Sequence, residues 1–153
     1  MHLATHGVLD SQAPERSYIV LAGPADSPQD GRLGYLEIPG LYEPLRDTQL
    51  VVLSACETAV PLAAQGDAVQ GAGLEIAGLA NQFRRAGVPR LLASLWQVSD
   101  ESTAALMLRF YEALGEGRSP AAALATAQRA MITHPEFGHP FYWAPFILIG
   151  SPR

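Results

Sequence analysis

The sequence predicts an α/β domain with a mostly parallel sheet and helices on both faces. Two continuous apolar runs, residues 49–55 and 90–96, have the pattern of strands that are covered on both sides. Segments of helical periodicity alternate with such runs, which is typical of parallel sheets. The length of 153 residues and the apolar fraction of 48% suit one compact domain. We therefore expect residues 1–153 to form a single domain.

The other predicted strands are short. Residues 2–5, "HLAT", read as an apolar strand, and residues 146–149, "FILI", as the last strand. Residues 17–23 and 31–38 are two β-prone runs separated by "PADSPQD", and they predict a β-hairpin with an exposed loop. A buried parallel strand at the very start usually has neighbours, so we expect the chain to be the C-terminal part of something larger.

A first helix is predicted within residues 74–87. Gly87 and Pro89 supply its stop signals, and one helical face is apolar. The residues before it, 61–73, are rich in Ala, Gly and Gln without clear periodicity, which favours a mobile loop. We expect the helix to bury the side chains on its apolar face, namely Ile76, Leu79, Ala80, Phe83 and Ala86.

Two further helices follow the run at residues 90–96. Ser99 or Asp100 is suited to cap a helix that extends through Leu114. Ser119 with Pro120 behind it is an N-cap followed by proline at the first helical position, and "AAALATAQRAMI" continues with good helix formers. These signals predict two consecutive helices close to the C-terminus.

Charge and cysteine usage exclude several classes of function. The net charge is −5 and the ten basic residues are scattered, so we expect no nucleic-acid or membrane partner. No run approaches the roughly 18 apolar residues of a membrane span. The single cysteine forms no internal disulfide, and the start has no pattern of a secretion signal. We expect a cytoplasmic protein.

The candidate chemistry lies at two strand ends. His6 follows the run at residues 2–5, and Cys56 follows the run at residues 49–55. Ligands and catalytic groups gather at the carboxyl ends of strands in open α/β sheets. A cysteine hydrolase needs a histidine near its thiol and backbone amides aimed at the oxyanion, and Gly7 leaves its amide accessible. The order and spacing, 56 − 6 = 50, match a caspase signature.

These residues resemble the CHAT domain, a caspase-like and separase-like group of cysteine peptidases that is often attached to tetratricopeptide repeats. The similarity spans nearly the whole chain, in the family's order. It is carried by the segments "HLATHG", "LVVLSACET", "AGVPRLLASLWQVSDEST", "LMLRFYEALGEGRSPAAALATAQ" and "HPFYWAPFILIG". The resemblance implies a caspase-like fold with a β-hairpin insertion, no cofactor, and a protein or peptide substrate. It also implies a tetratricopeptide or other regulatory domain as a partner.

The resemblance implies a His6–Cys56 dyad with the amides of Gly7 and Cys56 as the oxyanion hole. It further implies a thioester acyl-enzyme, hydrolysed by water that His6 activates. Separase-like relatives carry an acidic residue just after the tryptophan, where this sequence has Gln97, with Asp100 as the nearest acid. The family's upstream strands have no counterpart here. These departures favour the alternative function, an inactive interaction or scaffold module.

Simpler interpretations remain for single residues. Taken alone, a cysteine at a strand end is more often structural. His2, His6 and Cys56 could form a zinc site, although no clear further ligand is present. The stretch of glycines after Pro61 does not fit G-x-G-x-x-G, so we expect no nucleotide site. We expect turn or capping roles for two histidines, and packing for most of the late aromatic residues: His134 and His139; Trp96, Phe141, Tyr142 and Trp143.

Overall fold

The structure is a computed structural model of the chain, and it describes residues 1–5, 7–8, 18–21, 31–34, 37–54 and 68–151. A central sheet has four strands in the order β1-β5-β6-β7. Their bounds are β1 (His2–Leu3), β5 (Val51–Leu53), β6 (Arg90–Ser94) and β7 (Phe146–Gly150). The first three strands run parallel, and β7 pairs antiparallel with β6. This confirms the predicted α/β fold with a mostly parallel sheet.

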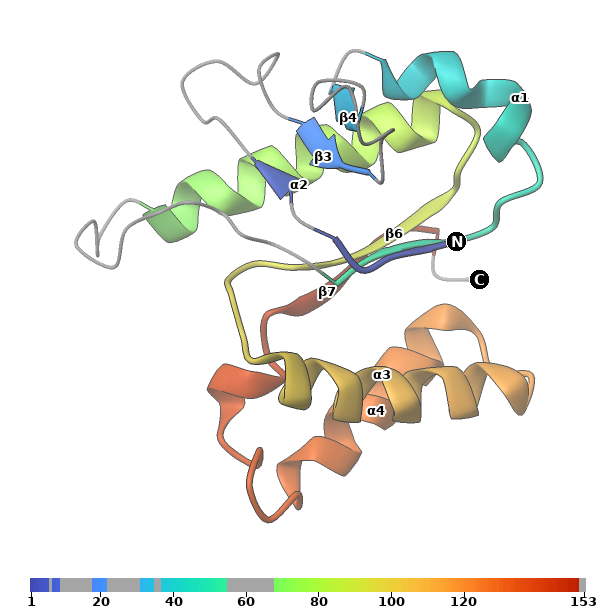
Figure 1. Ribbon diagram of the computed structural model, residues 1–153. Coiled ribbons are helices and arrows are strands. Elements are labelled where there is room, and N and C mark those ends of the chain that lie inside the picture. The colour runs from blue at the N-terminus through green and yellow to red at the C-terminus, as the bar shows by residue number, and fades with distance from the viewer. Residues whose placement is uncertain (6, 9–17, 22–30, 35–36, 55–67, 152–153) are drawn as a thin grey trace.

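Helices cover both faces of this sheet, as Figure 1 shows. On one face lies the long helix α2 (Ala68–Arg85), together with the short elements η2 (Ile38–Leu41) and α1 (Tyr42–Leu45). On the other lie α3 (Asp100–Gly115) and α4 (Pro120–Ile132), which pack against each other. Among the described helices, none has the length and apolar character that a membrane crossing requires.

The sheet separates two hydrophobic cores. Successive side chains of a strand point to opposite faces, so β5 contributes to both cores. Val51 and Leu53 belong to the core on the α2 side, whereas Val52 belongs to the core on the α3/α4 side. All three are buried. This two-sided burial explains why the strand reads as a continuous apolar run instead of an alternating one.

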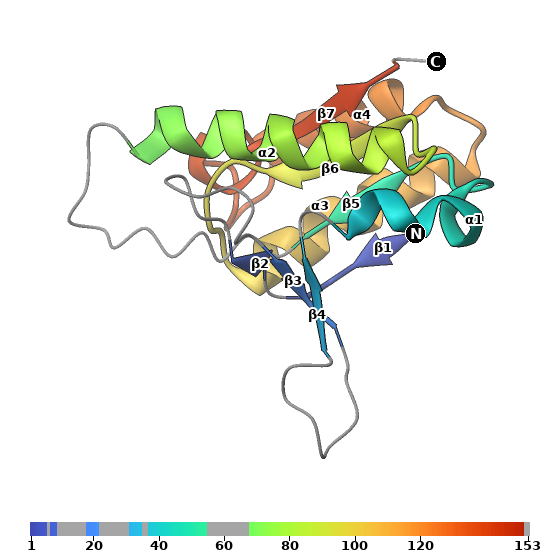
Figure 2. The same ribbon diagram turned by 90° about the horizontal axis from the view of Figure 1, so that it is seen from above.

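The predicted hairpin is present as part of a second, three-stranded sheet. Its strands β3 (Tyr18–Val20) and β4 (Arg32–Gly34) pair antiparallel, and β2 (Gly7–Val8) adds a third strand beside β3. Figure 2 shows these strands on the β1 side of the central sheet, away from β7. The prediction of a strand up to Ile38 was wrong, because that residue begins η2, where Pro39 suits the first turn of a helix.

The first predicted helix starts earlier than expected. α2 begins at Ala68, so the predicted loop over residues 61–73 was wrong for its last six positions, 68–73. The five side chains expected on its apolar face are all buried. Its end follows the glycine signal: Gly87 has φ 89°, and the amide of Val88 donates to the carbonyl of Phe83 at 3.0 Å. This pattern is a Schellman motif.

The two later helices begin at the predicted caps. Ser99 Oγ accepts a hydrogen bond from the amide of Ser102 at 3.2 Å, and Ser119 Oγ accepts one from Ala122 at 3.4 Å. Each bond satisfies one of the free amides in a first helical turn. Of the two candidate caps for α3, Ser99 is therefore the cap, and Asp100 is the first helical residue.

The predicted turn roles of two histidines are also confirmed. His139 caps the short helix η3 (Pro140–Tyr142) by accepting a bond from the amide of Phe141. His134 Nδ1 accepts bonds from two amides of the turn that follows α4. The late aromatic residues differ among themselves, because Phe141 is 48% exposed whereas Trp143 packs against the α3/α4 core.

Candidate active site at the strand ends

The carboxyl ends of the three parallel strands meet at one edge of the central sheet. β1 and β5 are in register, with His2 opposite Val52 and Leu3 opposite Leu53. The paired residues are 50 positions apart in the sequence (52 − 2 and 53 − 3). The amide of Ser54 also donates to the carbonyl of Leu3 at 3.3 Å. The strands therefore stay paired up to the point where each one ends.

His6 and Cys56, the predicted dyad, both lie outside the residues that the structure describes. The last described residues before them are Thr5 and Ser54, which follow β1 and β5 at the same sheet edge. The separation in sequence, 56 − 6 = 50, equals the offset of the registered pairs in the two strands.

Gly7, the predicted oxyanion residue, lies in β2 opposite Ile19. The chain thus passes from the central sheet to the three-stranded sheet between Leu3 and Gly7. Thr5 lies in this crossing, and its hydroxyl donates a hydrogen bond to the carbonyl of Val20 in β3. The crossing is therefore attached to the central sheet on one side and to β3 on the other.

A side-chain pair at this edge was not predicted. His2 Nε2 lies 2.7 Å from Ser54 Oγ, a hydrogen bond between β1 and the end of β5. The His2 ring also lies 5.7 Å from the ring of Tyr111 in α3, measured between centroids. The only sequence signal was a polar residue at the start of the run 2–5, His2, and another near the end of the run 49–55, Ser54. The pairing itself depends on the strand register, which the sequence pattern does not specify.

Partial burial shifts the pKa values of His2 and of its neighbour Tyr111. Partial desolvation of the imidazole first, and the positive amino terminus of Met1 second, lower the pKa of His2 from its ordinary value. The lowered pKa favours the neutral imidazole. Its Nε2 atom accepts from the Ser54 hydroxyl in the tautomer that is protonated on Nδ1 and donates to it in the other. Burial also raises the pKa of Tyr111, so its phenol stays protonated beside the ring.

The predicted substrate-pocket residues both follow β6: Gln97 lies between β6 and α3, and Asp100 is the first residue of α3. Both are exposed. The segment between β6 and α3 is held by Trp96, whose Nε1 donates to the carbonyl of Phe141 at 3.0 Å. Asp100 lies in the first turn of α3, where a carboxylate interacts favourably with the helix dipole.

Metal binding finds no further support in the part of the chain that the structure describes. Within it, no group of three His, Cys, Asp or Glu side chains is arranged to hold an ion. Of the three residues in the zinc interpretation, only His2 is described, and its Nε2 atom bonds to Ser54.

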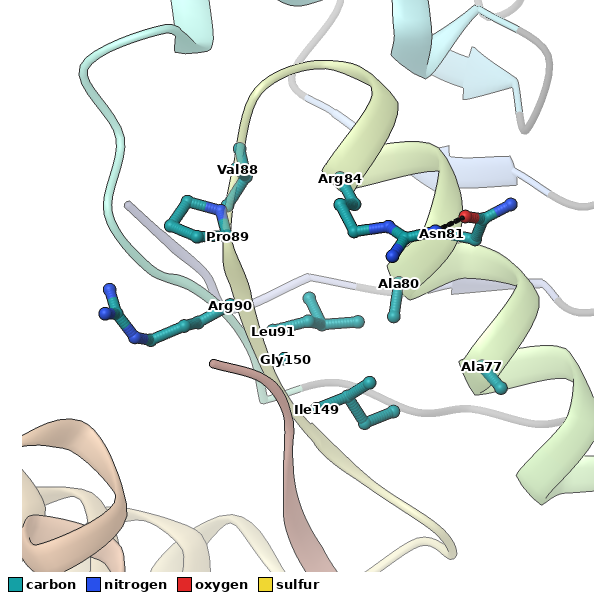
Figure 3. A pocket seen from close by; sticks show the side chains of 10 residues that line it. All are labelled: Ala77, Ala80, Asn81, Arg84, Val88, Pro89, Arg90, Leu91, Ile149 and Gly150. Atoms are coloured by element: carbon teal, nitrogen blue, oxygen red, sulfur yellow. Dashed lines mark hydrogen bonds between the residues drawn. The ribbon is translucent and has the colours of Figure 1, made fainter. Parts of the chain in front are cut away.

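A small cavity of about 200 Å³ lies between α2 and the sheet. Figure 3 shows the side chains that line it. Ala77 and Ala80 of α2 line one side, and Leu91 and Ile149 of the sheet line the other. It adjoins the first residues of β6, the opposite end of that strand from the candidate site. Arg90 at its rim donates to the carbonyls of Gln49 and Ser151. This cavity is therefore separate from the candidate site.

The fold and the site edge define an α/β domain of the caspase-like type. Comparison with protein families identifies it further, because the family model of the CHAT domain matches residues 1–151. The chain therefore belongs to the CHAT domain family, which is part of the caspase-like peptidase superfamily.

Two curated relatives carry the same name. The chain is 36% identical over 76 residues to tetratricopeptide repeat protein 28 of Homo sapiens, an alignment that covers 50% of this chain and 3% of the relative. It is 33% identical over 103 residues to tetratricopeptide repeat protein 28 of Mus musculus, an alignment that covers 67% of this chain and 4% of the relative. The matched region is a very small part of these relatives.

Proposed function

We propose that this chain is a cysteine endopeptidase domain that cuts protein substrates with a His6–Cys56 dyad. The observation that carries the proposal is the register of β1 on β5. Registered residues in the two strands are 50 positions apart, and His6 and Cys56 have the same separation. Membership of the CHAT family supports the same chemistry.

The reaction proceeds by acyl transfer. The Cys56 thiolate attacks the scissile carbonyl carbon, a C–S bond forms, and the carbonyl electron pair moves to oxygen, toward the amides of Gly7 and Cys56. The C–N bond then breaks, and the amine leaves with a proton from the His6 imidazolium. Water attacks the thioester next and gives a proton to His6. The C–S bond then breaks, which restores the Cys56 thiolate and releases the carboxylic acid product.

Substrate selection is assigned to the exposed segment after β6. Gln97 and Asp100 would contact the side chain before the scissile bond. Gln97 is uncharged, so a basic side chain there gains no direct ion pair from this position. Cleavage of a peptide library that varies the residue before the scissile bond measures this preference. We expect Gln97→Glu to raise kcat/KM for arginine-containing peptides relative to neutral ones, and an unchanged preference would remove this residue from the pocket.

Attached or partner repeats would regulate the domain. The curated relatives are tetratricopeptide repeat proteins by name, which supports such an arrangement for this chain. A reducing compartment, the cytoplasm, would keep Cys56 as a free thiol.

The single cysteine allows a direct test of the dyad. Cys56 is the only thiol in the chain, so its rate of alkylation by iodoacetamide, measured against pH, reports one thiolate. A histidine partner shifts the apparent pKa of a thiol below the usual value of about 8.5. We expect that shift in the wild type, its loss in His6→Ala, and loss of peptide cleavage in both His6→Ala and Cys56→Ala. An alkylation profile that is identical in wild type and His6→Ala would refute the dyad.

The second candidate is an interaction module without catalysis. It is favoured by Gln97, which stands where separase-like relatives have an acid. This alternative predicts that the protein with its repeats cuts nothing and binds its partner equally well as Cys56→Ala. Cleavage that disappears in that variant would exclude it.

A further inference from the structure

One side-chain hydrogen bond joins the two strands that lead to the proposed dyad. It runs from His2 in β1 to Ser54, the first residue after β5, with 2.7 Å between Nε2 and Oγ. His2 is registered with Val52, so the bond reaches two residues along β5 toward the carboxyl edge. Ser54 is separated from Cys56 by one residue.

Apart from this bond, β1 is held by its backbone pairing with β5 and by the residues on either side of it, since the amino group of Met1 donates to Leu50 and the Thr5 hydroxyl to Val20. It is two residues long and pairs only with β5 among the described strands. Leu3 is only partly buried against the α2-side core. Backbone bonds alone allow a short strand to slip, and a slip of one residue turns every side chain to the other face. A specific side-chain bond across the pair opposes such a slip.

His2 is an exposed residue whose ring contacts the α3/α4 side of the molecule through Tyr111. Its centroid lies 5.7 Å from that of Tyr111, and Tyr111 packs edge-on against Phe110 at 5.3 Å. Phe110 is fully buried in the α3/α4 core. A continuous line of contacts therefore leads from this core through Tyr111 and His2 to Ser54.

From this arrangement we propose that His2 and Ser54 are positioning residues for the dyad. Their hydrogen bond fixes β1 on β5 and thereby sets the distance between His6 and Cys56. This inference rests on the proposed function. It assigns His2 and Ser54 no contact with the substrate; they act through the two residues that follow their strands. Because a misplacement of about 1 Å can cost about 100-fold in rate, a small shift in register has a measurable effect.

The test measures Cys56 in the full chain by the same alkylation profile, together with kcat and KM for a cleaved peptide. Ser54→Ala and His2→Leu each remove the bond, whereas Ser54→Thr keeps the hydroxyl. We expect the two disrupting variants to raise the apparent pKa of the thiol toward the value seen in His6→Ala. We also expect kcat to fall on the order of tenfold with little change in KM, and Ser54→Thr to restore the wild-type values.

A matched control separates positioning from loss of stability. Ser119→Ala removes a serine hydroxyl bond at the start of α4, on the α3/α4 side of the sheet. It should lower the melting temperature and leave the profile of Cys56 unchanged. The double variant His2→Leu/Ser54→Ala should be no worse than the poorer single variant, because both remove one bond.

The outcomes distinguish this inference from the proposed function. The apparent pKa of the thiol could shift in His6→Ala but keep its wild-type value in Ser54→Ala and His2→Leu. That result overturns the positioning role and is consistent with the dyad. An ordinary thiol in the wild type that is insensitive to His6→Ala refutes the dyad, and the positioning role with it. Equal shifts in Ser54→Ala and Ser119→Ala show that general destabilisation is the cause, and this too overturns the positioning role.

Discussion

The two faces of the central sheet are covered in different ways. The α3/α4 side is one continuous stretch, residues 100–132, whose two helices pack on each other. The α2 side is assembled from separate parts of the chain: η2 and α1 near residue 40, α2 after residue 67, and Ile19 of the hairpin. The first covering is local in sequence, and the second is not.

This difference determines how the site edge is supported. Local helix pairs need little loop closure, whereas contacts between distant segments form only after the entropy of closure has been lost. β1 contacts both coverings, because Leu3 packs toward the α2 side and His2 contacts Tyr111 on the α3/α4 side. The candidate site therefore depends on both coverings at once.

The largest expected effect comes from emptying either core. Phe110 on the α3/α4 side and Phe83 on the α2 side are both essentially buried, at 0% and 1% exposure. Truncation of such a residue to alanine costs about 3–5 kcal/mol. We expect Phe110→Ala and Phe83→Ala each to lower the free energy of unfolding, measured in urea, by that amount.

Hydrogen exchange distinguishes the two coverings in these variants. Phe83→Ala should reduce protection in α2 before it reduces protection in α3 and α4, because the helix pair retains its own contacts. Phe110→Ala should weaken both helices of the pair together. Equal loss of protection in all helices of both variants would show that the two coverings unfold as one cooperative unit. The proposed difference between them would then be wrong.

A smaller effect is expected where β7 ends beside α2. Gly150 has φ 119°, and a Cβ atom there would lie 2.1 Å from the carbonyl oxygen of Pro89. Both the strained φ and the contact with backbone oppose a side chain, at about 1–3 kcal/mol. Gly150→Ala should lower the melting temperature clearly. Gly115→Ala in α3 is the matched control, because its Cβ meets open space and should be neutral or stabilising.

The sequence was sufficient for the elements that local signals control. Ser99, Ser119 and Gly87 fixed three helix ends, and the apolar runs located β5 and β6. The start of α2 was missed because glycine has a low intrinsic helix propensity, and tertiary context overrides such a preference. The His2–Ser54 bond was missed for another reason. It depends on which residues of two distant strands face each other, and composition and periodicity do not contain that information.

The local character of the α3/α4 side predicts a defined response to loss of a cap. Ser99→Ala removes the hydroxyl that accepts from the amide of Ser102, and an N-cap of this kind contributes about 1 kcal/mol. Thermal unfolding followed by circular dichroism should show that loss. Ser99→Asp keeps an acceptor at the cap and should retain most of the stability. Full stability of Ser99→Ala would show that packing alone holds the start of α3.

The smallest effect is a dependence of stability on pH through His2. Its pKa is lowered in the folded chain, by burial first and the charged amino terminus second, so the unfolded chain binds this proton more readily. Stability therefore rises with pH wherever the unfolded state binds more protons. The contribution of His2 is fully present above the usual pKa of about 6.5 and is lost as pH falls through the lower folded value. Urea midpoints across this window should show that step in the wild type and not in His2→Gln. Parallel profiles for the two proteins would mean that the imidazole does not sense the folded environment, and the contact across β1 and β5 would then carry no electrostatic component.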